Sequence, residues 1–231
     1  MNLGNLKSLA YRSVPQFKQS DANDTITELI LNMGAQDVAL RTQCLRTNQK
    51  FTVTADTQSY NLTSFLTRYL VPTEAGLFWN AGDGTTTNWK QLDAKTIEYW
   101  DKEMPNWRDI DSGTPSEYAI DGDVLYLKST PDTTLASGLW MYFAQAPAEM
   151  TDDDHYPFGG GTEIHRLKIL SECILRYFDW QANSIINKQA LQPQKETEYL
   201  RSIENKKELL DARLDISNSS EVRLRGPHIG R

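Results

Sequence analysis

The sequence predicts an α+β protein: a helical bundle with three main helices, an inserted antiparallel β domain and an extended C-terminal tail. Apolar residues recur at helical spacing from Ile26 to Cys44, from Ile164 to Ile185 and, in a narrower stripe, from Leu200 to Leu214. From Lys50 onwards the period changes to two and turn residues become frequent, which is typical of strands. The order helix, strands, helices indicates a helical scaffold split by the β region.

Composition sets the first limits. The chain has 231 residues, of which 39% are hydrophobic and 24% charged, so it can bury a substantial core in one large or two small domains. No apolar run approaches the ~20 residues that a membrane helix needs, and the first 17 residues lack the apolar stretch of a secretory signal. We therefore expect no membrane contact and assembly in a cytosol. Cys44 and Cys173 are expected to be two buried thiols.

Charge is unevenly distributed along the chain. The net charge is -7, but residues 1–20 carry +3 and residues 217–231 carry +2, which leaves -12 for residues 21–216. An acidic body argues against a DNA-gripping surface, whereas two cationic ends suggest arms that dock on acidic partners. The expected partner-binding residues are Lys7, Arg12, Arg223, Arg225, His228 and Arg231.

The N-terminal part divides into an arm at residues 1–19 and a helix within residues 20–49. Thr25 and Glu28 have capping-box spacing. The expected apolar stripe is interrupted only at Asp37, and the small Gly34 could let another helix approach closely. The stripe consists of Ile26, Leu29, Ile30, Met33, Leu40 and Cys44, and the helix is expected to end near Asn48.

Residues 50–147 are predicted to form the inserted β domain. Phe51 and Val53 alternate with threonines, and the glycine-bearing turn 81–84 separates two strands of a hairpin. The clearest hairpin surrounds Asp121-Gly122, a dipeptide that favours a two-residue type I′ turn. The strand 138–145 is apolar on both faces, so we expect it to be central.

The C-terminal part is predicted to begin with a hinge loop at residues 148–161. A long helix then starts near Thr162 and runs to about Gln189, and a second helix covers about 195–214. Together with the first helix, residues 162–216 complete the bundle. Residues 217–231 contain little apolar surface and are expected to be an extended tail that a partner orders.

Few residues are candidates for catalysis or for binding a metal or phosphate. Asp152, Asp153, Asp154 and His155, with His165, could supply ligands to a hydrolytic metal site. They are contiguous in a loop, however, so ordinary loop and capping roles are the favoured interpretation. The glycines at 159–161 lack the Lys-Ser/Thr of a phosphate loop and are interpreted as a hinge. We therefore expect no enzyme activity, no catalytic residue, no cofactor and no metal.

Five of the six tryptophans lie in the β region. They could form a stacking platform for a glycan, in which case Trp79 and Trp107 would be the residues to test. The favoured alternative is a small β core and an oligomer interface, where tryptophan is enriched.

The order of short motifs is the most informative feature. FTVTADTQSYNL at 51–62 is followed by GTPSEY at 113–118, LYLKSTPD at 125–132 and WMYFAQAP at 140–147, and then by two helices. In this order the chain resembles head-to-tail adaptor (connector) proteins of tailed bacteriophages, over about residues 20–214.

The resemblance implies a structural ring subunit of the virion, in about 12 copies. Such rings join the portal vertex to tail or nozzle proteins and extend the DNA channel for packaging retention and ejection. DNA would pass through without sequence-specific binding, and a C-terminal segment would reach the portal or a neighbouring subunit. The alternatives are a Trp-rich virion or extracellular glycan-binding module and a metal-dependent hydrolase.

Overall fold

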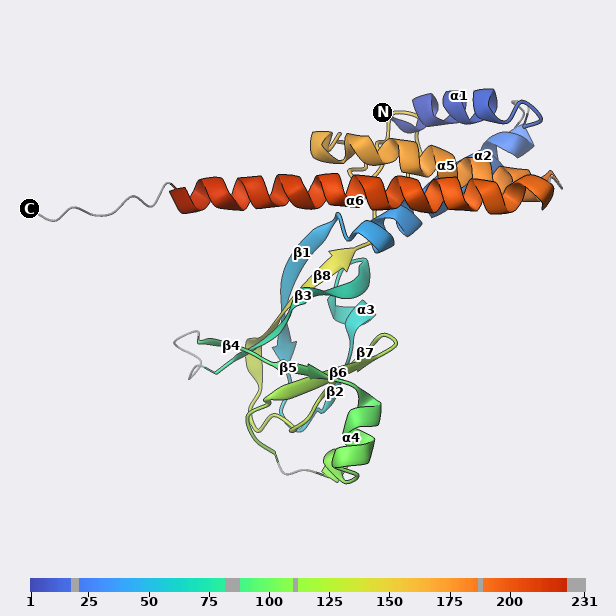
Figure 1. The fold of residues 1–231 in the computed structure, drawn as a ribbon. Coiled ribbons are helices and arrows are strands. Elements are labelled where there is room, and N and C mark those ends of the chain that lie inside the picture. The colour runs from blue at the N-terminus through green and yellow to red at the C-terminus, as the bar shows by residue number, and fades with distance from the viewer. Residues whose placement is uncertain (18–20, 82–87, 110–111, 187–188, 224–231) are drawn as a thin grey trace, which may run out of the picture. The chain divides into compact units, whose positions relative to one another are not determined.

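The computed structural model describes residues 1–17, 21–81, 88–109, 112–186 and 189–223. The chain divides into two compact units, one formed by Met1–Cys44 with Pro147–Arg231 and the other by Leu45–Ala146. The first unit is helical and the second contains two β-sheets (Figure 1). The fold is therefore mixed α+β, as the sequence predicts.

Four helices build the helical unit in the described part of the chain: α1 (Leu3–Ser13), α2 (Asp21–Thr42), α5 (Ser171–Ile185) and α6 (Gln192–Arg223). Short 3-10 segments cover His165–Leu170 and Gln189–Leu191. Helix α5 is central because it contacts α1, α2 and α6. This position explains its wide apolar face, which buries Cys173, Ile174, Tyr177, Phe178 and Ala182.

Two features of α2 explain how it packs. A Cβ atom on Gly34 would lie 3.0 Å from the ring of Tyr177, so the glycine permits the close approach of α5 that the sequence suggested. Asp37, the polar interruption of the expected stripe, accepts hydrogen bonds from the buried Tyr199 hydroxyl and, at 2.7 Å, from Arg41 Nε. Burial and the contact with Asp37 raise the pKa of Tyr199.

The two ends of the chain differ from the sequence prediction. Residues 3–13 form α1 instead of an arm, because Leu3, Leu6 and Ala10 make a narrow stripe that is fully buried. Helix α6 continues to Arg223, so residues 217–223 are helical and not an extended tail. The bundle thus has α1 in addition to the three main helices predicted; residues 224–231 lie outside the described residues.

The bounds of the other helices also need correction. Helix α2 ends at Thr42 and a strand begins at Arg46, where the sequence indicated a helix to about Asn48. The segment after the glycines opens with 3-10 geometry, which is frequent at helix starts, and regular α-helix begins only at Ser171. Cys173 is buried as expected, whereas Cys44 is half-buried.

The β unit consists of two four-stranded sheets. One has the order β1-β8-β3-β4 and the other β2-β7-β6-β5, and all pairs are antiparallel except β5 with β6. The short helices are α3 (Leu62–Phe65), α4 (Ile97–Glu103) and a 3-10 turn at Trp107–Asp109. The strands are β1 (Arg46–Val53), β2 (Ser59–Asn61), β3 (Tyr69–Asn80), β4 (Trp89–Gln91), β5 (Asp93–Lys95), β6 (Glu117–Asp121), β7 (Val124–Leu127) and β8 (Leu135–Gln145).

The main core of the β unit takes side chains from both sheets. Phe51, Leu77 and Phe143 of one sheet join Leu125 and Leu127 of the other in one buried cluster. A smaller cluster of Trp100, Trp107 and Ala119 lies where α4 covers the second sheet. The indole N–H groups of both tryptophans are satisfied, donating to Glu117 at 3.0 Å and to Asp101 at 2.8 Å.

The predicted strands are largely confirmed. Strand β8 is central, between β1 and β3, and the hairpin of β6 and β7 is present. Its turn differs by one residue: Asp121 pairs with Val124, so the loop is Gly122-Asp123. Only Gly122 of this loop has a positive φ, at +57°, the pattern of a type II′ and not a type I′ turn. In the expected turn 81–84, residues 82–84 lie outside the described residues.

Candidate functional site

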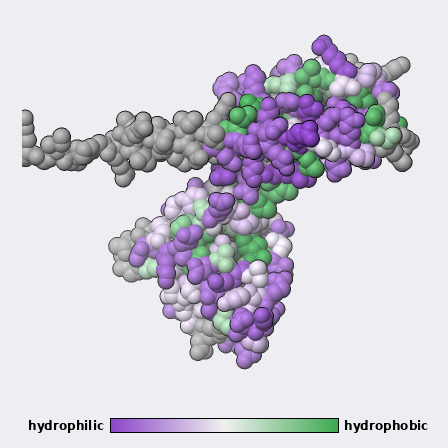
Figure 2. Space-filling view, in the orientation of Figure 1, coloured by the Kyte–Doolittle hydropathy of each residue, from purple (hydrophilic) through white to green (hydrophobic). Residues whose placement is uncertain are grey.

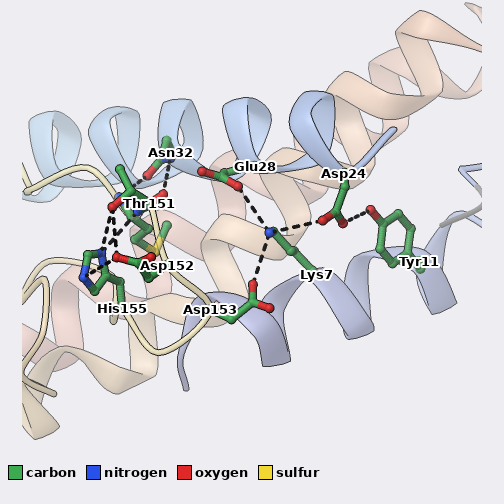
Figure 3. A network of polar contacts seen from close by, with 10 residues as sticks. Lys7, Tyr11, Asp24, Glu28, Asn32, Thr151, Asp152, Asp153 and His155 are labelled. Carbon is green, nitrogen blue, oxygen red and sulfur yellow. Dashed lines mark hydrogen bonds and ion pairs between the residues drawn. The ribbon is translucent and has the colours of Figure 1, made fainter. Parts of the chain in front are cut away.

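A cluster of charged groups joins three segments of the helical unit (Figure 3). Lys7 of α1 extends its ammonium group towards Asp24 and Glu28 of α2 and Asp153 of the loop that precedes α5. The distances from Nζ to the carboxylate oxygens are 3.5, 3.2 and 3.1 Å, respectively. The Lys7 side chain is only 12% exposed. One cation therefore contacts three acidic groups from two segments, α2 and the loop before α5.

The electrostatics of this cluster favour a permanent cation. Burial alone would lower the pKa of Lys7, but its contacts with Asp153 and Glu28 and the charge of Asp24 outweigh it and raise the pKa. Asp24 also accepts a 2.6 Å hydrogen bond from the Tyr11 hydroxyl. Burial and this bond raise the pKa of Tyr11, so the phenol stays a neutral donor.

Backbone hydrogen bonds attach the same loop to α1 and α2. The N–H groups of Leu3 and Gly4 donate to the carbonyls of His155 and Asp153 at 2.8 and 3.0 Å. Asn32 makes a pair of bonds to the backbone of Met150, donating to its carbonyl at 3.0 Å and accepting from its N–H at 2.9 Å. These contacts hold the first half of the expected hinge at 148–161 to α1 and α2.

The residues considered for a metal site have separate roles in this arrangement. Asp153 pairs with Lys7, whereas Asp152 contacts His155 Nε2 at 3.3 Å and His155 Nδ1 accepts from the N–H of Thr151. His165 is 86% exposed and lies 3.3 Å from Glu163. Within the described ranges, no group of three or more His, Cys, Asp or Glu side chains is placed to hold a metal ion.

The expected partner-binding residues fall into three groups. Lys7 serves an internal contact, so it is not a free cation on an arm. Arg12 is exposed in the last turn of α1. Arg223 is the last residue of α6, and Arg225, His228 and Arg231 lie outside the described residues.

The tryptophans of the β unit divide into two sets. Trp79 and Trp107 are 4% and 1% exposed, so neither can stack on a sugar in this fold. A half-buried aromatic group lies instead on the outer face of the first sheet, where Lys50 Nζ lies 5.1 and 5.3 Å from the ring centres of Trp89 and Trp140. Phe78 and Tyr142 pack against Trp140 in the same group. These rings contact one another on a half-buried face of the sheet.

The sequence gives no sign of the Lys7 contacts. The partners Lys7 and Asp153 are 146 residues apart in the chain. The run of acids at 152–154 marked the right loop, but it indicated metal ligands or loop capping and not an ion pair with α1. The bond between Asn32 and Met150 spans 118 residues and has no local motif either.

Comparison with known protein families identifies the family of this chain. The model of the SU10 adaptor protein family matches residues 1–225. The chain belongs to this family. The resemblance to phage head-to-tail adaptors is thereby confirmed over nearly the whole sequence, including α1, which the motifs left out. No curated protein matches the sequence significantly.

Membership of the SU10 adaptor family has direct consequences. The family is one of structural phage proteins and not of enzymes, and it implies a virion component that associates with portal and tail proteins. In the described part of this adaptor, no helix combines the length and apolarity needed to cross a membrane.

Proposed function

We propose that this adaptor joins the portal vertex of a phage head to its tail. In this proposal it is one subunit of a homo-oligomeric ring, of about 12 copies, that docks under the portal and receives tail or nozzle proteins. The observation that carries the proposal is the family match over residues 1–225, because it spans both units and not one element alone.

The proposed ring extends the DNA channel for packaging retention and ejection. The -12 charge of residues 21–216 supports a channel that repels phosphate and lets DNA pass without sequence-specific binding. The loop contacts described above support a structural role for the acids at 152–154, since two of the three already have partners within the chain. Assembly takes place in the host cytoplasm, before or during attachment of the tail.

The cationic C-terminal residues are proposed to dock on the portal or on a neighbouring subunit. Arg223 is the last residue of the long α6, and Arg225, His228 and Arg231 come after it; in the sequence 217–223 the single apolar residue is Val222. Arg12 is the matching exposed cation of α1, whereas Lys7 is already engaged. The roles divide accordingly between a folded body and a cationic C-terminal segment that binds partners.

Electron microscopy of the protein mixed with its portal tests the function. We expect a ring of fixed symmetry beneath the portal, and the same ring at the connector of intact virions. A connector that contains no copy of this chain would overturn the proposal.

A truncation tests the C-terminal segment. We expect a chain ending at Ile216 to keep its helical circular dichroism per residue and its unfolding midpoint but to lose co-sedimentation with the portal. The matched control is the full chain with Arg108→Gln, which removes one exposed cation of the β unit. Unchanged portal binding by the truncated chain would refute the role of this segment.

A further inference from the structure

The outer face of the first sheet of the β unit carries aromatic side chains. Successive side chains of a strand point to opposite faces, so Lys50, Phe78 and Tyr142 lie opposite their sequence neighbours in the main core. In the strand register Trp140 lies between Lys50 of β1 and Phe78 of β3. We call the group formed by Lys50, Phe78, Trp89, Trp140 and Tyr142 the aromatic face. Figure 2 shows that hydrophilic side chains cover most of the β unit in this view, and the outer face of an antiparallel sheet is ordinarily polar, so the aromatic face is unusual.

The aromatic face is cationic. Lys50 is exposed, its ammonium group is held over the rings of Trp89 and Trp140, and it makes no ion pair with any other described residue. The four strands of this sheet carry three cations and one acid, which are Arg46, Lys50 and Lys90 against Glu74. The face therefore presents a positive charge, in a place fixed by two rings, to an anionic group from outside.

The opposite side of the β unit is acidic. The main core lies between the two sheets, and α4 packs on the outer face of the second sheet, where Ala119 contacts Trp100 and Trp107. Asp93 and Asp121 lie on this same outer face, because β5 pairs with β6 and side chains alternate along each strand. Counted over β2, β5, β6, β7, α4 and the 3-10 turn after it, this side carries seven acids and three cations.

Ion pairs within the unit leave much of this negative charge unpaired. Three of the seven acids have cationic partners: Asp101 contacts Arg108, Glu103 contacts Lys102 and Glu117 contacts Lys128. The remaining four are exposed, and none forms an ion pair with another residue that the structure describes; they are Asp93, Glu98, Asp109 and Asp121. We call this surface, formed by α4, the 3-10 turn and the outer face of the second sheet, the α4 side.

The α4 side also carries an aromatic residue that can enter an interface. Tyr99 of α4 is 46% exposed and is the neighbour of the unpaired Glu98. Tyrosine provides a large contact area at a small entropic cost and packs edge-to-face on other rings. A tyrosine beside a carboxylate complements a surface on which a lysine lies over tryptophan rings, since the ring meets rings and the carboxylate meets the ammonium group.

This distribution of charge selects both a partner and a direction. Two aromatic faces repel each other through Lys50, and two α4 sides repel each other through their unpaired acids. The aromatic face of one copy and the α4 side of another attract each other, and they lie on opposite sides of the same unit. A contact of this head-to-tail kind repeats in one direction and closes into a ring when the rotation between copies allows it.

We propose that the aromatic face of one copy binds the α4 side of the β unit of a second copy. The inference rests on the proposed ring, and it adds the surfaces, the direction and the chemistry by which neighbouring subunits meet. The contact joins two folded β units largely through charge, so it is weak between free subunits and becomes weaker as the salt concentration rises.

The test uses the full chain with one set of variants for each surface. Lys50→Glu reverses the charge of the aromatic face, and Glu98→Lys with Asp109→Lys reverses that of the α4 side. The controls make the same charge changes at exposed residues of α6, with Lys207→Glu for the first and Glu204→Lys with Glu208→Lys for the second. Sedimentation velocity from micromolar to about 1 mM protein measures self-association.

We expect weak association of the unchanged chain at about 0.05 M salt, and at least ~5-fold weaker association at about 0.5 M. Each surface variant should lose at least ~10-fold, and each control should change by less than ~2-fold. An equal mixture of the two surface variants should recover association, because the intact aromatic face of one meets the intact α4 side of the other. A contact between like faces would not be recovered in this way.

Three outcomes would overturn the inference. They are a monomer at every concentration up to about 1 mM at low salt, equal association by Lys50→Glu, and a mixture of the two variants that stays monomeric. Circular dichroism checks folding, and the milder Lys50→Gln replaces Lys50→Glu if that variant does not fold. A connector lacking the chain would remove the proposed function alone, whereas a self-associating chain that Lys50→Glu leaves unaffected would remove this inference alone.

Discussion

The two units of this adaptor enclose their apolar residues to different degrees. Among the described residues of the β unit, only Phe65 and Tyr99 are large hydrophobic side chains that are exposed. The described side chains of the helical unit include nine: Leu9, Ile26, Leu29, Met33, Leu40, Ile185, Leu191, Leu200 and Leu209. The β unit is thus complete by itself, whereas the helical unit leaves apolar surface for other contacts.

The difference follows from how each unit is layered. The β unit places one core between two sheets and covers part of the second sheet with α4, so the inward faces of its strands are enclosed. The helical unit arranges α1, α2 and α6 around α5, and each outer helix keeps one side towards solvent. Scattered apolar residues on such sides are ordinary, but a stripe at regular spacing on α2 is not.

The largest expected effect comes from separating the units. We expect residues 45–146 to fold alone, because the two ends of this segment are already joined: Leu45 accepts a 2.8 Å hydrogen bond from the N–H of Gln145, and Arg46 pairs with Ala144. A cooperative thermal transition and dispersed amide resonances of this fragment would show that it folds independently. A fragment without cooperative unfolding would contradict the independence of the β unit.

A core substitution should affect the β unit next most strongly. Phe143→Ala removes a fully buried ring from the main cluster, and we expect the free energy of unfolding to fall by about 3–5 kcal/mol. The control is the neighbouring Tyr142→Ala, whose half-buried ring lies on the other face of β8. Denaturant unfolding followed by tryptophan fluorescence measures both. Equal losses would mean that the outer face is as important as the core.

Removing the Lys7 cation should have a moderate effect on the helical unit. Lys7→Met leaves Asp24, Glu28 and Asp153 without their shared partner, and we expect a loss of about 1–2 kcal/mol, since the exposure of Asp153 lets water screen part of the repulsion. Lys207→Met, an exposed lysine of α6, is the control. Adding Asp153→Asn to the Lys7 variant should recover part of the loss; no recovery would indicate that the charge is unimportant.

The smallest expected effect is a pH dependence of the β unit. Burial would raise the pKa of Glu117, but hydrogen bonds from Trp100 and Lys128 outweigh it and lower the pKa below the ordinary value of 4.5. A lowered pKa in the folded state means that the carboxylate stabilises the fold above about pH 4.5 and that this contribution is lost as the pH falls through the folded value. Thermal unfolding of residues 45–146 between pH 3 and 7, compared with Glu117→Gln, should show a flatter profile in the variant, by at most ~1 kcal/mol.

Local patterns predicted the strands better than the helices. The β6–β7 hairpin and the central β8 depend on turn residues and on runs of apolar side chains, which are visible within ten residues. Helix α1 was missed because only Leu3, Leu6 and Ala10 mark its buried side, within a segment whose other residues are mostly polar.

The case of α2 shows why periodicity alone cannot place a core. The helix has apolar residues on two sides, and the expected stripe combined Ile30 with Ile26, Leu29 and Met33. The structure buries Ile30 but exposes the other three, and it buries the side where Gly34 and Ala35 let α5 approach. Helical spacing alone could not separate the two sides. The ion pairs of Lys7 could not be predicted either, since their partners are distant in the chain.

The helical unit is built from two separate parts of the chain, so it can fold completely only after the second part has been synthesised. Asp153, the partner of Lys7, is synthesised 146 residues after it, and Met150, the partner of Asn32, is synthesised 118 residues after it. During synthesis the β unit is finished first, since its residues are contiguous and all precede α5. Nascent α1 and α2 therefore spend the translation of about a hundred residues without their partners, a period in which a chaperone or another nascent copy can reach their apolar sides.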